Sequence, residues 1–157
     1  MEKIFVLHGL DHDKMGKAGG AHAVTMEELN ELMREKAKQL GVEVEFFQNN
    51  DSAVVCKKIL ALKSEGVSGI VFNPAEWMTS GEAIAAALAE AKLPCVEVHM
   101  GNPCKKADTH NVIAPSVTGL VTGFDTLVYP EGMGLLVAYL RKAYLQIQQG
   151  KAGLQSR

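Results

Sequence analysis

The feature that most constrains the fold is a regular alternation between short β-rich runs and longer segments with helical periodicity. The β-rich runs contain many Val, Ile and Phe residues and are bounded by Gly, Pro, Asn or His, as short strands are. We expect strands at about residues 4–7, 42–47, 69–72, 95–98 and 119–124.

Capping patterns mark the expected helix boundaries between these runs. Thr25 with Glu28, and Thr79 with Glu82, have the spacing of capping boxes and predict two helix starts. Gly41 ends the first of these helices. The predicted helices cover about residues 25–41, 51–66, 79–92 and 133–149.

Strands that alternate with helices predict an α/β fold with one parallel sheet covered on both faces. Right-handed crossovers favour a flavodoxin-like three-layer sandwich with five parallel strands in the order 2-1-3-4-5. This order places a crevice between the first and third strands. We expect a single domain over residues 1–150 and a frayed polar tail over residues 151–157.

Composition excludes several classes of function. The chain has 157 residues and a net charge of −2, which gives no basic field for nucleic acid. No apolar run is long enough to cross a bilayer, and the N-terminus reads as a strand rather than a signal peptide. Cys56, Cys95 and Cys104 are odd in number and lack zinc-type spacing, which predicts reduced thiols in a cytoplasmic protein. The expected partner is a small molecule.

Polar side chains follow three of the predicted strands at the point where each ends. His8 follows the first, Asn73 the third, and His99 the fourth. Because ligands bind outside the carboxyl ends of strands in open α/β sheets, these residues predict a binding site. Taken alone, His99 could also be an ordinary histidine at a strand end, and Asn73 a turn former before Pro74.

The glycine-rich loop after the first strand has two further interpretations. Gly16 to Gly20 lack the spacing of a phosphate-binding motif, so a flexible lid over the crevice is favoured. A histidine and aspartate group in the same loop could bind a metal, but no regular spacing makes it converge, and a solvated loop is favoured. That group is His8, Asp11, His12, Asp13 and His22. We therefore predict no metal and no cofactor.

Motifs spread over residues 1–140 resemble the type II 3-dehydroquinate dehydratase family. The matching segments occur in the order and nearly the spacing of the family. They are residues 28–32, 41–50, 73–75 (Asn-Pro-Ala), 97–99 with Asn102, and 119–124. The resemblance implies a flavodoxin-like subunit, a homo-oligomer built from trimers up to a dodecamer, and a hydro-lyase that acts through an enolate.

The family's residue roles carry over to matching positions of this chain. The asparagine of the Asn-Pro pair, here Asn73, binds substrate hydroxyls, and the histidine of the Glu-Val-His run, here His99, protonates the departing hydroxyl. Glu97 lies two residues earlier, on the same face of the strand, and could orient the imidazole. The backbone amides of Met100 and Gly101 correspond to those that receive a substrate carboxylate.

Other positions depart from the family. Asp11 stands where an active-site asparagine is expected, Thr79 where a substrate-binding histidine is expected, and Ala86 where a substrate-facing aspartate is expected. The lid has neither the family's arginine nor its catalytic tyrosine, and the arginine expected after the fourth strand is absent. We assign Asp11, Glu97 and His99 to catalysis, and His8, Asn73, Thr79, Met100 and Gly101 to substrate binding.

These departures predict a hydro-lyase that acts on a related cyclic hydroxy-ketone acid and turns over 3-dehydroquinate poorly or not at all. The missing base could be replaced by Asp11, Asp13, His22 or Tyr129. One alternative is a competent 3-dehydroquinate dehydratase with a different lid alignment. Another is a non-catalytic small-molecule binder or assembly protein on the same scaffold.

Overall fold

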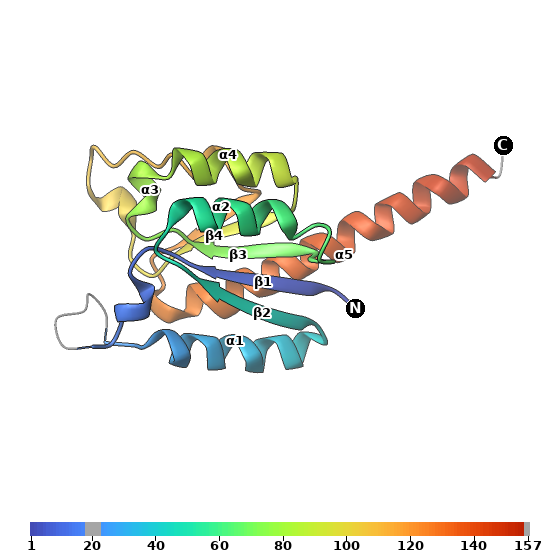
Figure 1. Ribbon diagram of the computed structural model, residues 1–157. Coiled ribbons are helices and arrows are strands. Elements are labelled where there is room, and N and C mark those ends of the chain that lie inside the picture. The colour runs from blue at the N-terminus through green and yellow to red at the C-terminus, as the bar shows by residue number, and fades with distance from the viewer. Residues whose placement is uncertain (18–22, 156–157) are drawn as a thin grey trace.

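The computed structural model describes residues 1–17 and 23–155, and of residues 152–155 it describes the helical backbone alone. Within these residues, five parallel strands form one sheet in the order β2-β1-β3-β4-β5 (Figure 1). The strands are β1 (Lys3–His8), β2 (Glu43–Gln48), β3 (Gly69–Asn73), β4 (Cys95–His99) and β5 (Gly119–Thr122). The predicted fold class and strand order are confirmed.

Helices cover both faces of the sheet, as Figure 1 shows. Helices α1 (Met26–Leu40) and α5 (Val128–Gln155) pack side by side on one face, and α2 (Ser52–Ala61) and α4 (Glu82–Ala91) on the other. A short helix, α3 (Trp77–Ser80), precedes α4. The two faces have separate cores because side chains alternate along each strand: in β1, Ile4 and Val6 join one core, and Phe5 and Leu7 the other.

The position of each strand in the sheet explains its sequence pattern. β3 and β4 lie inside the sheet with both faces covered, so every residue of both strands is buried. β5 forms an edge, and its Leu120 is 48% exposed. The predicted fifth strand is too long, because Gly123 and Asp125 adopt positive φ and turn the chain away after Thr122.

One of the two predicted capping boxes is present. The Thr25 hydroxyl accepts a hydrogen bond from the Glu28 backbone N–H, and the Glu28 carboxylate accepts one from the Thr25 N–H. The predicted box of Thr79 with Glu82 is wrong. Thr79 lies within α3, where its hydroxyl donates to the Glu76 carbonyl, and α4 starts after Gly81.

Helix α5 differs from its prediction at both ends. It begins at Val128 rather than at about residue 133, because Pro130 fits in the first turn, where its nitrogen needs no hydrogen-bond partner. At the other end the helix continues to Gln155 and extends beyond the sheet (Figure 1). Among the described residues, no helix combines the length and apolar character needed to cross a membrane.

Candidate active site

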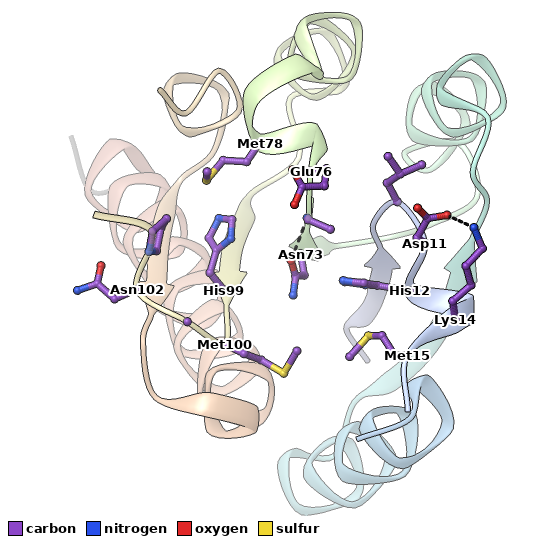
Figure 2. Close-up of a pocket in the computed structure, with 14 residues that line it drawn as sticks. Asp11, His12, Lys14, Met15, Asn73, Glu76, Met78, His99, Met100 and Asn102 are labelled. Carbon is purple, nitrogen blue, oxygen red and sulfur yellow. Dashed lines mark hydrogen bonds and ion pairs between the residues drawn. The ribbon is translucent and has the colours of Figure 1, made fainter. Parts of the chain in front are cut away.

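A pocket of about 530 Å³ opens at the carboxyl ends of β1, β3 and β4 (Figure 2). This edge is where the strand order reverses between β1 and β3, and where the chain leaves the sheet in loops. The pocket is lined by Leu10, Asp11, His12, Lys14, Met15, Asn73, Ala75, Glu76, Met78, His99, Met100, Gly101, Asn102 and Pro103.

The loops after β1 and β3, which both contribute residues to the pocket wall, are in close contact. A Cβ atom placed on Gly9 would lie 2.4 Å from the Asn73 carbonyl oxygen and 2.5 Å from the Pro74 carbonyl carbon. Only glycine permits this approach, because any side chain would overlap the backbone of the neighbouring loop. Gly9 therefore allows the loops after β1 and β3 to converge at the pocket.

His99 lies on the pocket wall and is held from below by a buried carboxylate. Its Nε2 is 2.6 Å from Oε1 of Glu97. Glu97 is fully buried and lies two residues earlier on β4. The Asn111 side-chain amide donates to the same Glu97 oxygen at 2.7 Å. Because a carboxylate can only accept, the His99 Nε2 carries a proton. The carboxylate thus orients the ring and can balance the charge of an imidazolium.

Asn73 lies between His99 and the loop after β1 in Figure 2. Its Oδ1 accepts from the Ala75 N–H at 3.1 Å, and its Nδ2 donates to the Tyr129 hydroxyl at 3.0 Å. Ala75 has φ +53°, a left-handed conformation that a non-glycine residue rarely adopts. The Asn73 amide is therefore fixed at both ends while it lines the pocket.

His12 points into the pocket from the opposite side, with a ring nitrogen facing Asn73 (Figure 2). Its Nδ1 accepts a hydrogen bond from the Gly9 backbone N–H at 3.0 Å. An acceptor nitrogen carries no proton, so the neutral ring has its proton on Nε2. This geometry makes His12 a hydrogen-bond donor rather than a base. The prediction that it lies in a solvated loop is wrong, because only 4% of it is exposed.

Comparison with known proteins agrees with this geometry. A family model described as "Dehydroquinase class II" matches residues 2–137.

The chain belongs to the dehydroquinase class II family.

Individual members of the family align with most of this chain. The 3-dehydroquinate dehydratase of Syntrophotalea carbinolica is 37% identical over 137 residues, which cover 85% of this chain and 93% of the relative. The crystal structure of type II dehydroquinase from Propionibacterium acnes superposes with a TM-score of 0.79 at 27% identity, over 88% of this chain and 99% of that one. A 3-dehydroquinate dehydratase-like protein from Bifidobacterium longum gives 0.68 at 27% identity, over 90% and 99%.

The structure brings most of the residues assigned from the class II family resemblance to one place. Asp11, Asn73, His99, Met100 and Gly101 all line the pocket. Glu97 lies beneath the wall and reaches the pocket only through His99. The remaining two assigned residues, His8 and Thr79, are not on the pocket wall.

His8 and Thr79 lie away from the wall for different reasons. His8 is buried under the loop after β1, where its Nε2 donates to the Asn30 side-chain oxygen at 2.6 Å. Burial lowers the pKa of this imidazole below its usual range, and the bond to Asn30 opposes that shift only in part. Thr79 is exposed on α3, and the residue before it, Met78, lines the pocket instead.

Asp11 lines the pocket in a constrained backbone conformation. It has φ +60°, and its backbone N–H donates to the Asn50 side chain at 2.8 Å. Its carboxylate pairs with Lys14 at 2.7 Å and raises the pKa of that amine. Asp11 is thus the sequence-predicted replacement base that lines the pocket; Asp13 pairs with Asn50 away from it, and His22 lies outside the described residues.

Tyr129 does not fit the role of an incoming base. It is fully buried, it is absent from the pocket wall, and burial raises the pKa of its phenol far above the usual value. A group that is harder to ionise and out of reach of a ligand cannot accept a proton from it. Tyr129 is linked to the pocket wall by its hydrogen bond with Asn73.

Sequence reasoning missed two of the three methionines on the wall, Met15 and Met78. Met15, Met78 and Met100 line the pocket together with His12. Met100 was assigned to substrate binding through its backbone amide, whereas Met15, in the loop after β1, and Met78, in α3, have no pattern that marks a ligand contact. Among the described residues, no group of three or more His, Cys, Asp or Glu side chains could hold a metal ion.

Proposed function

We propose that this chain is a hydro-lyase that removes water from a cyclic β-hydroxyketone acid, with His99 as the general acid and poor activity on 3-dehydroquinate. The observation that carries the proposal is the His99 imidazole on the pocket wall, backed at 2.6 Å by the buried Glu97 carboxylate. A histidine held in this way can keep its ring oriented while its other nitrogen, Nδ1, delivers a proton to a leaving hydroxyl.

Asp11 supplies the base in this proposal. Its carboxylate takes the proton from the carbon next to the ketone, and the C–H electron pair forms an enolate. The enolate then expels the β-hydroxyl, which leaves as water with the proton from His99. The Asn73 amide is a donor on the same wall that can stabilise the enolate and bind substrate hydroxyls.

The charged groups of the pocket support poor activity on 3-dehydroquinate. The arginines that the structure describes are committed elsewhere: Arg34 pairs with Glu27 and Glu31, and Arg141 with Glu2. Lys14, the lysine on the wall, already pairs with Asp11. Since lysine lacks the planar fork of arginine, it is a weaker substitute for a bidentate carboxylate partner.

A direct assay tests the proposal. Appearance of the conjugated enone product in the ultraviolet is followed with 3-dehydroquinate and with analogues that lack one ring hydroxyl. We expect kcat/KM for 3-dehydroquinate to be at least about 100-fold below the usual enzyme range of about 10⁴–10⁸ M⁻¹ s⁻¹, and higher for an analogue. His99→Ala should reduce any turnover by about 10²–10⁴-fold. His110→Ala, which changes an exposed histidine, is the matched control.

Asp11→Asn tests the base separately, because it restores the residue of the family. If Asp11 is the base, the substitution lowers kcat by about 100-fold or more. Unchanged or increased turnover would show that Asp11 only occupies a binding position.

One alternative has specific support: relatives at 31–37% identity carry the name 3-dehydroquinate dehydratase. Ordinary rates with 3-dehydroquinate would establish that function for this chain and contradict the proposed poor activity. Absence of turnover with every substrate, together with tight binding of one of them, would favour a non-catalytic binder.

A further inference from the structure

Helix α5 places a buried phenol directly behind the predicted substrate-binding asparagine. Its first turn lies against β4: a Cβ atom on Gly132 would be only 2.9 Å from the Val98 Cγ1. The close approach sets Tyr129, in the same turn, against the sheet at the carboxyl end of β3. Tyr129 is fully buried, and its hydroxyl is 3.0 Å from the Asn73 Nδ2.

The hydrogen-bonding capacity of Asn73 shows what this contact leaves for a ligand. A primary amide has two N–H donors and two lone pairs on its oxygen. The Ala75 backbone N–H can only donate, so it fixes the Oδ1 on its own side of the turn. Tyr129 then receives one of the two N–H groups. One N–H and one oxygen lone pair remain for the pocket, in a plane that can no longer rotate.

We propose that Tyr129 is a positioning residue, which locks the Asn73 amide so that its second N–H faces the bound ligand. This inference rests on the proposed function insofar as Asn73 contacts the substrate. Because burial keeps the phenol neutral, it accepts this hydrogen bond across the whole working pH range. Asn73 is therefore presented as a donor, suited to a hydroxyl, carbonyl or carboxylate oxygen of the ligand.

A double-mutant cycle separates positioning from a purely structural role. Tyr129→Phe removes the acceptor and keeps the ring, and should raise KM for 3-dehydroquinate about 3- to 10-fold with little change in kcat. In an Asn73→Ala background the same substitution should change KM by less than about twofold, since it acts through Asn73. Tyr144→Phe, on the same helix but exposed, is the control. Equal effects of Tyr129→Phe in both backgrounds would overturn the proposal.

A second measurement needs no turnover and so distinguishes this inference from the proposed function. Nitrogen-15 NMR of the free protein follows the Asn73 side-chain amide, assigned by its loss in Asn73→Ala. Tyr129→Phe should speed exchange of these amide protons with water by about 3- to 10-fold, and Tyr144→Phe should not. Unchanged exchange in a folded Tyr129→Phe protein would overturn the proposal even if 3-dehydroquinate is turned over. If Tyr129→Phe does not fold, fluorotyrosine at position 129, a weaker acceptor, should shift the same resonances.

Discussion

At the scale of single residues, the polar groups near the pocket are held by partners from distant parts of the chain. Asn73 is held by Tyr129, 56 residues away, and His8 by Asn30, 22 residues away. Glu97 is held by Asn111, 14 residues away. Each pairing gives a buried polar side chain a hydrogen-bond partner and so lowers the cost of its burial. The orientation of the site therefore depends on side chains outside the motifs that identify it.

The burial of His8 predicts a pH dependence of stability. Its pKa is lowered in the folded state. Below about pH 6.5 the His8 imidazole is therefore protonated in the unfolded chain but stays neutral in the folded chain until the pH is lower. The free energy of unfolding should then fall as the pH is lowered from about 6.5. In His8→Gln, which can still donate to Asn30, urea unfolding between about pH 8 and pH 5 should show a shallower decline.

His110→Gln is the control for this experiment, because His110 is exposed and its replacement should leave the slope of the wild type. Identical slopes in His8→Gln and the wild type would show that His8 does not contribute to the acid sensitivity.

At the scale of elements, local sequence and packing contributed differently to where helices begin. The box of Thr25 and Glu28 is local: both residues lie in one turn, and the spacing alone identified it. The same spacing failed at Thr79, where packing determined the start of the helix. Trp77 is buried, and this draws residues 77–80 into a separate turn that Gly81 closes through its N–H to the Trp77 carbonyl. Capping signals hold only where packing does not compete.

At Gly9, the loop after β1 contacts the loop after β3, and both loops line the pocket. Gly9→Ala would place a methyl group 2.4 Å from the Asn73 carbonyl oxygen, so the loops after β1 and β3 would have to separate. We expect a loss of about 1–3 kcal/mol in the free energy of unfolding, and weaker ligand binding. Gly119→Ala is the matched control, since no heavy atom lies within 4 Å of its added Cβ. Equal stability of the two variants in chemical denaturation would contradict this account.

At the scale of the whole molecule, an apolar surface remains open beside the edge strand. Leu120 on β5 and Leu135 and Tyr139 on α5, here called the β5–α5 surface, are 48%, 61% and 49% exposed. The alanine-rich helix α4 uses small residues for packing inside the subunit. Ala85, Ala87 and Ala91 are buried within the chain, so part of its small-residue pattern serves internal packing.

We expect the chain to form a homo-oligomer whose subunit number is a multiple of three, with the β5–α5 surface in a subunit contact. Exposed apolar patches rimmed by polar residues mark such contacts. Leu135→Glu should lower the mass measured by light scattering at micromolar concentration. Leu60→Glu, at a residue 45% exposed on α2, should leave the mass unchanged. A wild-type protein that is monomeric in this measurement would contradict the expectation.

The sequence by itself determined the fold class, the strand order and the residues at the strand ends. These follow from local rules: helical and strand periodicity differ, crossovers have one hand, and parallel strands bring their carboxyl ends to one edge. For this reason His99 and Asn73 could be assigned to one site, and the structure places both on the wall of one pocket.

Only the tertiary structure decided which neighbouring residues join them. His12 and Met15 enter the pocket and His8 does not, although all three belong to the same stretch after or at the end of β1. Tyr129 became a partner of Asn73 because α5 starts earlier than its periodicity indicated and packs tightly on β4. These outcomes depend on close approach between segments far apart in the chain. The local sequence pattern does not predict the distances between such segments.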